Sequence, residues 1–267
     1  MIEYVVPILF FLGLGALAGV LLTVASRFLA VKTDETVEKI TEALPGANCG
    51  GCGYSGCAGY AEAVAKGEAP TNLCKPGGAD VTAEISAIMG VEAVAAEREV
   101  AFVRCNGSCN ATTDKYNYIG TPTCLASEKF FNGKGACRSG CLGFGDCVSV
   151  CDRGAISVVD GVAVINPAKC GSCGKCVKAC PNHLIVMRRE SQKVIVRCSS
   201  IDTGKVTRSV CKNGCIACKL CEKKCSYDAI HVNNNHAEID PEKCTRCGEC
   251  AAACPTKCIT ILPECVK

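Results

Sequence analysis

The sequence KCGSCGKCVKACP at residues 169–181 decides the fold, and KCTRCGECAAACP at residues 243–255 repeats its pattern. In both stretches the cysteines follow C-x2-C-x2-C-x3-C, and a proline comes next. Thiols spaced this closely serve one metal centre more naturally than separate disulfides, and the spacing is typical of iron–sulfur ligation. The two stretches therefore predict cluster-binding modules, and the remaining cysteines can be interpreted from them.

Cysteine is the outlying residue of the composition. The chain of 267 residues holds 27 cysteines and no tryptophan. Such a density indicates either a disulfide scaffold or metal clusters. The odd count and the tight spacing favour clusters, whose thiolate ligands require a reducing compartment. The formal net charge is only +3, from 29 basic and 26 acidic side chains, so we expect no nucleic-acid partner.

The second half of the chain contains two copies of one pattern, and equivalent residues differ by 74 in number. This shift relates Pro167 to Pro241 and Cys124 to Cys198. A match at this many positions indicates an internal duplication. The same shift relates eight further pairs of cysteines, in which Cys137, Cys141, Cys147, Cys151, Cys170, Cys173, Cys176 and Cys180 match Cys211, Cys215, Cys221, Cys225, Cys244, Cys247, Cys250 and Cys254.

Each copy joins its two cysteine runs by a stretch that predicts two short strands around a turn, at residues 155–170 and 229–244. This arrangement resembles the bacterial two-cluster ferredoxin, a small α+β module in which the fourth cysteine of each run ligates the other cluster. For the second copy the resemblance implies one [4Fe–4S] cluster on Cys215, Cys218, Cys221 and Cys254, and another on Cys244, Cys247, Cys250 and Cys225.

The first copy departs from the pattern at Phe144, which stands where the second copy has Cys218. By the same crossing rule, one of its clusters is complete on Cys170, Cys173, Cys176 and Cys151. The other keeps Cys141, Cys147 and Cys180, which suit a [3Fe–4S] centre unless a fourth thiol joins them. We favour Cys137 as that fourth ligand. The alternative is that Cys137 serves something else, because Cys211 has the equivalent place where no ligand is missing.

A further cluster region precedes the two copies. It contains Cys49, Cys52 and Cys57 in a C-x2-C-x4-C spacing, and sixteen residues separate Cys57 from Cys74. The glycines between these cysteines let a loop wrap closely around a cluster and turn backbone N–H groups towards its sulfides. We therefore expect a [4Fe–4S] cluster here, with a zinc site as the alternative.

The N-terminal stretch from Val5 to Ala25 carries no charge over 21 residues. That length suffices to cross a bilayer core of about 30 Å, so we expect a single transmembrane helix. Its first basic residues, Arg27 and Lys32, follow it. The positive-inside tendency then places the N-terminus outside the cell membrane and the cluster domains in the cytoplasm.

Five clusters on four cysteines each use 20 of the 27, and the remaining seven allow a sixth. These seven are Cys105, Cys109, Cys124, Cys198, Cys211, Cys258 and Cys265. The chain has only three histidines, no phosphate-binding fingerprint and no nucleophile–base constellation. It therefore moves electrons and has no complete active site of its own.

The order of parts resembles the Rnf complex's iron–sulfur subunit, the one designated B, over essentially the whole chain. A membrane anchor (1–26) precedes the N-terminal [4Fe–4S] domain (34–92), a connecting region (93–136) and the first (137–190) and second (198–262) ferredoxin-like modules. The resemblance implies an electron-transfer subunit that passes electrons from reduced ferredoxin into an ion-pumping (Na+ or H+), NAD-reducing membrane complex. Its implied partners are flavin-bearing and other membrane subunits, ferredoxin and the lipid bilayer.

Two alternatives to this function remain at the level of sequence. One is an anchored polyferredoxin subunit of another redox complex, of the hydrogenase or heterodisulfide reductase type. The other is a zinc protein with structural cysteine sites. Lys219, Lys223 and Lys224 form a basic spot that either docks an acidic redox protein or is a solvated face.

Overall fold

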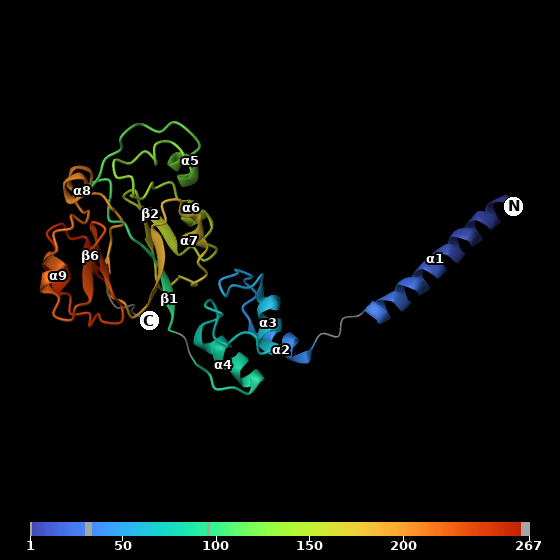
Figure 1. Ribbon diagram of the computed structural model, residues 1–267. Helices are drawn as coiled ribbons and strands as arrows, with labels where there is room; N and C mark the ends of the chain where they lie inside the picture. The colour runs from blue at the N-terminus through green and yellow to red at the C-terminus, as the bar shows by residue number, and fades with distance from the viewer. Residues whose placement is uncertain (1, 30–33, 95–96, 263–267) are drawn as a thin grey trace.

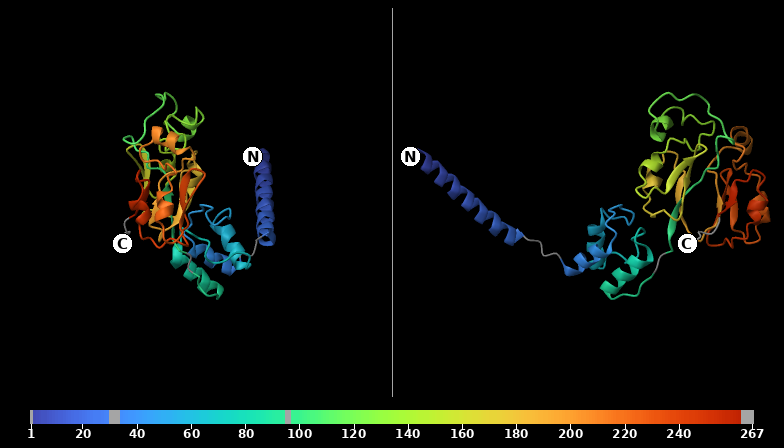
Figure 2. Two further views of the ribbon diagram at one scale, coloured as in Figure 1. Left: turned by 60° about the vertical axis from the view of Figure 1, so that its left-hand side comes forward. Right: turned by 180° about the vertical axis from the view of Figure 1, so that it is seen from behind.

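The computed structural model describes residues 2–29, 34–94 and 97–262, and side chains over 10–24 in the first of these ranges. The described chain consists of the N-terminal helix α1, a helical domain, and two modules built from short helices and two-stranded sheets (Figure 1). The views in Figure 2 show the two modules side by side, with the helical domain between them and α1.

The N-terminal helix α1 spans Ile2–Leu29, and its described side chains, from Phe10 to Val24, are exposed. The prediction of a transmembrane helix is wrong on the described residues: none of their helices is both long and apolar enough to cross a bilayer. Of the basic residues from which the topology was predicted, Lys32 lies outside the described residues, and the side chain of Arg27 is not among the described side chains.

The helical domain contains α2 (Glu35–Ala43), α3 (Cys57–Ala65) and α4 (Gly78–Met89). Ile40, Tyr60 and Ile85, one from each helix, are at most 1 % exposed and form its core. The Tyr60 hydroxyl donates to the Pro70 carbonyl at 2.8 Å and accepts from the Leu73 N–H at 3.1 Å. These two bonds fix the loop that carries Cys74 against the helix that begins at Cys57.

Each module contains two antiparallel strand pairs. In the first module, β1 (Glu99–Val103) pairs with β4 (Ile185–Arg189), and β2 (Ile156–Val159) with β3 (Val162–Ile165). In the second, β5 (Val194–Val196) pairs with β8 (Ile259–Ile261), and β6 (Ile230–Asn233) with β7 (His236–Ile239). The two predicted hairpins, β2–β3 and β6–β7, are therefore confirmed. Strand β1 comes from the predicted connecting region and joins the sheet of the first module.

Short helices lie next to the strands and begin inside the cysteine runs. They are α6 (Asp146–Ser149), α7 (Lys175–Ala179), α9 (Leu220–Lys224) and α10 (Glu249–Ala252). Three of the four start after a glycine at positive φ, namely Gly145, Gly174 and Gly248, because this left-handed conformation suits glycine. Two more helices, α5 (Cys124–Glu128) and α8 (Gly204–Val210), precede the first run of each module.

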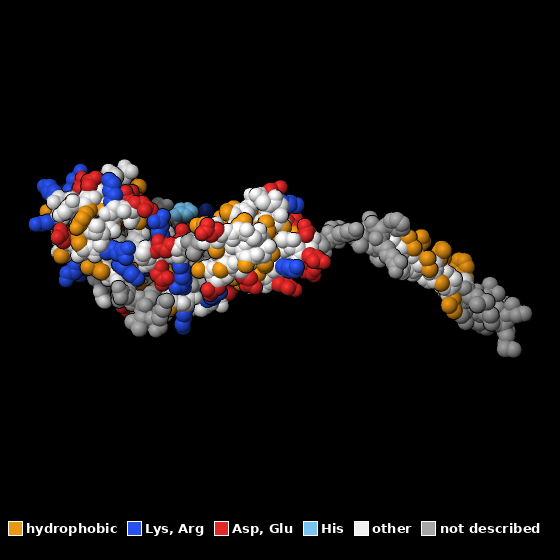
Figure 3. Space-filling model, turned by 90° about the horizontal axis from the view of Figure 1, so that it is seen from below, with side chains coloured by type: hydrophobic (Ala, Val, Ile, Leu, Met, Phe, Trp, Pro, Cys, Tyr) orange, Lys and Arg blue, Asp and Glu red, His pale blue; other side chains and the backbone are white. Residues whose placement is uncertain are grey.

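The two modules are held together by polar contacts as well as by packing. Arg189 forms an ion pair with Glu242 at 2.6 Å, and Thr112 Oγ1 donates to the Val210 carbonyl at 2.7 Å. Arg188 is only 8 % exposed and donates to the backbone carbonyls of Arg189 and Gln192. Figure 3 shows acidic and basic side chains intermixed over the face of the modules, so neither sign of charge dominates there.

Candidate metal centres

The four cysteines predicted for the N-terminal cluster converge in the helical domain. Burial raises the pKa of the Cys74 thiol, and the nearby charges of Cys57, Cys49 and Cys52 raise it further. The Asn48 side-chain oxygen accepts from the Cys57 N–H at 2.8 Å and folds the glycine-rich loop back onto α3. A Cβ at Gly56 would meet this oxygen at 2.9 Å, so the close approach requires glycine.

A second set of thiols consists of Cys170, Cys173 and Cys176 from one run and Cys151 from the run before it. Burial, followed by the charges of the other three sulfurs, raises the pKa of Cys176 to about 11. The Ala155 N–H points to the Cys151 sulfur at 3.3 Å. The structure thus brings together the crossed set that the ferredoxin resemblance implies.

These first two sets lie directly beside each other. One cavity of about 130 Å³ is lined by Cys49 of the helical domain and by all four thiols of the second set. A Cβ at Gly51 would lie 3.5 Å from the Cys173 carbonyl oxygen, in van der Waals contact. The glycine-rich loop therefore packs on the cysteine run of the first module.

Cys124 lies beside the three thiols that lack a fourth cysteine because position 144 is a phenylalanine. A small cavity is lined by Cys124, Cys141, Cys147 and Cys180. Burial and then the charges of Cys141, Cys124 and Cys180 raise the pKa of Cys147 to about 12. The Phe144 ring instead contacts the Tyr118 ring, with centroids 5.6 Å apart. Cys137, our predicted fourth ligand, is not among the residues that line this cavity.

The position of Cys124 is fixed by Asp146. The Asp146 carboxylate accepts from the backbone N–H groups of Cys124 at 2.8 Å and Leu125 at 2.9 Å. These are the first two residues of α5, whose N–H groups have no partner within the helix. Sequence reasoning missed Cys124 because it lies seventeen residues before Cys141 and belongs to no recognisable spacing.

The second module holds the two sets that the resemblance implies. Burial raises the pKa of Cys221 and of Cys250 to about 11, and in each case the nearby sulfurs are the other members of the expected set. Cys218 and Cys247, one in each set, are exposed. The second module therefore brings one thiol of each set to the surface.

Cys258 is a cysteine that the sequence left unassigned. It is 2 % exposed, and its sulfur lies 3.6 Å from Cys254 Sγ. The hydrogen bond from the Cys258 thiol lowers the pKa of Cys254, because it stabilises the thiolate of that residue. Cys265, by contrast, lies outside the described residues.

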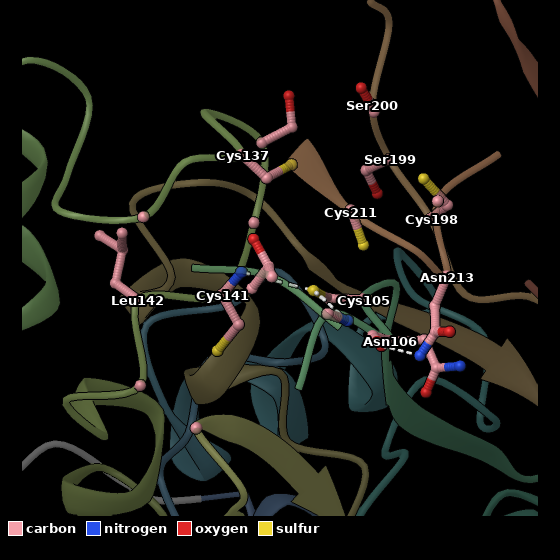
Figure 4. Close-up of a pocket in the computed structure, with 18 of the residues that line it drawn as sticks. Cys105, Asn106, Cys137, Cys141, Leu142, Cys198, Ser199, Ser200, Cys211 and Asn213 are labelled. Carbon is pink, nitrogen blue, oxygen red and sulfur yellow. Dashed lines mark hydrogen bonds between the residues drawn. The ribbon is translucent and has the colours of Figure 1, made fainter. Parts of the chain in front are cut away.

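Cys137 lies at a different cavity, of about 390 Å³, between the two modules (Figure 4). Its neighbours there are Cys105, Cys198 and Cys211. Burial raises the pKa of Cys137, and the charges of these three thiols raise it further, to about 11. Cys109 also lines this cavity and is exposed. Five of the unassigned or disputed thiols thus line one cavity.

The donor chemistry suits iron–sulfur clusters. The converging groups are thiols, which select soft metals and Fe–S clusters, and several sulfurs accept from backbone N–H groups. Within residues 34–94 and 97–262, no three His, Cys, Asp or Glu side chains close on a point that would hold a single metal ion. A [4Fe–4S] cluster makes a different demand, because each thiolate binds its own iron.

Comparisons with known proteins agree with this chemistry. Residues 44–76 match the family described as putative Fe-S cluster, and residues 163–186 and 237–260 match the 4Fe-4S binding domain. The first match contains Cys49 to Cys74. The other two contain Cys170 to Cys180 and Cys244 to Cys254.

Full-length relatives were also found, and all three described here are the B component of their complex. The chain is 45 % identical to the B component of an ion-translocating oxidoreductase complex of Methanosarcina acetivorans, over 93 % of this chain and 95 % of the relative. It is 42 % identical to the B component of a Na(+)-translocating ferredoxin:NAD(+) oxidoreductase complex of Acetobacterium woodii, over 92 % of this chain and 74 % of the relative. The counterpart from a proton-translocating ferredoxin:NAD(+) oxidoreductase complex of Clostridium ljungdahlii is 40 % identical (92 % and 88 %).

Proposed function

The chain belongs to the family formed by the B components of ion-translocating oxidoreductase complexes, and on that premise we propose that it takes electrons from reduced ferredoxin and passes them towards NAD+ reduction in such a complex. Its role as an iron–sulfur electron-transfer subunit follows from the family and from the matched 4Fe-4S domains. Donor and acceptor are taken from the names of two relatives. Because these two relatives translocate different ions, the proposal specifies no ion.

The observation that carries the proposal is the contact between successive thiol sets. A [4Fe–4S] cluster supplies reversible one-electron transfer when bound. The chain contributes thiols to hold it, backbone N–H groups directed at the sulfurs, and buried surroundings that exclude water. Gly51 of the helical domain packs on the Cys173 carbonyl. The N-terminal thiol set and the thiol set of Cys173 are therefore neighbouring steps of one electron-transfer route.

We further propose that electrons enter at the second module. Cys218 and Cys247 are exposed, so a cluster bound there lies within reach of a soluble donor. Lys219 is 57 % exposed, and Lys223 and Lys224 end the same helix. Their charges complement an acidic donor and would speed its encounter with the chain.

The partners of the proposal follow from the same premise. Ion translocation takes place in a membrane-bound complex, so we place the chain beside the other subunits of that complex. The flavin-bearing subunits expected from the resemblance are the proposed acceptors. Electrons then leave from the N-terminal set, at the far end of the route from Cys218 and Cys247.

The experiment is electron uptake by the whole chain, reconstituted anaerobically with iron and sulfide. Reduced ferredoxin is added in steps while the visible absorbance of the clusters and their EPR signals are followed. We expect the clusters to be reduced by ferredoxin, and the same chain loaded with zinc to take up no electrons. Clusters that dithionite reduces but ferredoxin does not would refute the proposed donor, and a chain that binds only zinc would refute the electron-transfer role.

A further inference from the structure

We propose that Cys105, Cys137, Cys198 and Cys211 hold a [4Fe–4S] cluster at the interface of the two modules, in addition to the five predicted. The inference rests on the proposed electron-transfer function and extends it. The four thiols come from four separate segments of the chain. Figure 4 shows their sulfurs directed towards one common space, whereas the sulfur of Cys141 points away from it. Cys105, Cys198 and Cys211 are 7–8 % exposed.

The duplication explains why four thiols meet here. Cys105 lies two residues after β1, and Cys198 lies two residues after β5, the equivalent strand of the second module. Cys137 and Cys211 are equivalent by the sequence shift. Each module therefore contributes the same two thiols to the interface. The shift of Cys124 onto Cys198 is a coincidence of numbering, because the first module contains an insertion after β1.

The backbone around the four sulfurs repeats one local pattern. Cys105 Sγ accepts a hydrogen bond from the backbone N–H of Gly107, two residues further on, at 3.4 Å. The backbone N–H groups of Ser139, Ser200 and Asn213 lie at the same offset beside Cys137, Cys198 and Cys211. The same pattern occurs at Cys141 and Cys215, which we assign to other clusters. Burial raises the pKa of all four metal-free thiols, and the neighbouring N–H groups oppose that effect because they stabilise a thiolate.

The surroundings of the cavity supply charge and space. Arg197 lines the cavity, and its Nε is buried with no hydrogen-bond partner among the described residues. Burial lowers the pKa of Arg197, and the neighbouring Cys105 charge opposes that effect. Gly107 lies between two of the thiols, since a Cβ there would be 3.5 Å from Cys105 Sγ and 3.7 Å from Cys211 Sγ. A larger residue at position 107 would fill the space that a cluster needs.

The position of the site gives it a role. The Cys141 N–H donates to Cys105 Sγ at 3.4 Å, and the backbone N–H of Cys215 lies beside the Cys198 sulfur. Cys141 belongs to a thiol set of the first module and Cys215 to one of the second. The interface site therefore touches a ligand residue on each side and joins the two modules into one route.

The test is the iron and acid-labile sulfide content of the whole reconstituted chain and its variants, with zinc measured in the same samples. We expect about 24 irons per chain, four for each of six clusters. In a variant with all four of these cysteines replaced by alanine we expect about 20. Cys109→Ala is the matched control, because Cys109 lines the same cavity yet is exposed, and it should keep the full iron content. EPR of the reduced samples should show one signal fewer in the fourfold variant only.

The outcomes separate this inference from the proposed function. About 20 irons in the unaltered chain, or zinc in place of the last four, would overturn the sixth cluster and leave the electron-transfer role intact. Iron content that does not change in the fourfold variant would overturn it too. If that variant fails to fold, the count in the unaltered chain still decides. Absence of iron from the unaltered chain would refute both proposals.

Discussion

The backbone N–H of Cys124 lies 2.8 Å from the carboxylate of Asp146 and donates to it, although 21 residues separate them. This bond holds the start of α5 against the start of α6. It places the Cys124 thiol beside Cys147. Cys147 belongs to the set in which Phe144 stands where a cysteine is usual. Cys124, which comes from an insertion, is thus positioned to replace the ligand that the standard spacing lacks.

The first prediction concerns Cys124 and Cys137. Cys124→Ser should convert the cluster on Cys141, Cys147 and Cys180 to a three-iron form, seen as an EPR signal in the oxidised sample that disappears on reduction. Cys137→Ser should leave that cluster intact. The reverse result would restore Cys137 as the fourth ligand, as the sequence alone suggested.

The second prediction concerns Asp146. Asp146→Ala removes the acceptor of two helix-terminal N–H groups, so α5 should detach more readily. We expect iron release to a chelator about tenfold faster from this cluster, which corresponds to about 1.4 kcal/mol. Glu35→Ala is the control, because Glu35 is 89 % exposed and forms an ion pair with Lys39. Equal release rates in the two variants would argue against a positioning role for Asp146.

The third prediction concerns the contact of the helical domain with the first module. Gly51→Leu should push the loop away from the Cys173 carbonyl and slow electron transfer to the N-terminal set, while iron content stays the same. Gly51→Ala places only a Cβ at 3.5 Å and should behave as the unaltered chain does. Rapid-freeze EPR after mixing with reduced ferredoxin measures the rate. A leucine variant with an unchanged rate would contradict the proposed route.

The fourth prediction concerns charge. Lys219→Glu combined with Lys224→Glu should lower the rate of reduction by ferredoxin several-fold at low ionic strength, and the difference should vanish at high salt. Lys66→Glu, at the residue that follows α3 in the helical domain, is the control. If the double variant shows the same salt dependence as the control, the basic spot is only a solvated face.

The fifth prediction concerns pH and the metal-free chain. Burial raises the pKa of Cys147 to about 12 and that of Cys176, Cys221 and Cys250 to about 11, above the value of about 8.5 in an unfolded chain. These thiols bind protons more tightly when folded, so their contribution to stability is fully present below pH about 8.5. It is lost as the pH rises towards 11–12.

Thermal unfolding under anaerobic, reducing conditions measures this effect. The metal-free chain should lose stability between pH 8 and 10. The cluster-loaded chain should lose little, because cluster binding has already displaced the protons. A metal-free chain whose midpoint stays constant over this range would show that the thiols are not held in buried positions without metal.

The sequence by itself determined the chemistry and most of the local structure. Spacing within one run predicted clusters, because ligands a few residues apart necessarily lie near one another. The alternating stretch between the runs predicted the two hairpins, and the duplication predicted two like modules. The crossed partners Cys151 and Cys225 came from a resemblance, since nothing local links them to their sets. The apolar N-terminal stretch led to a wrong prediction of a transmembrane helix on the described residues.

Only the tertiary structure decided which distant thiols meet. Cys124 lies beside Cys147 because its backbone N–H donates to the carboxylate of Asp146, far along the chain. Cys105 lies near Cys198 because β1 and β5 are equivalent strands of two modules that pack together. Sequence separation carries no information about such contacts once an insertion has shifted one copy against the other. The packing of the modules fixes them, because it brings two pairs of equivalent loops to one shared interface.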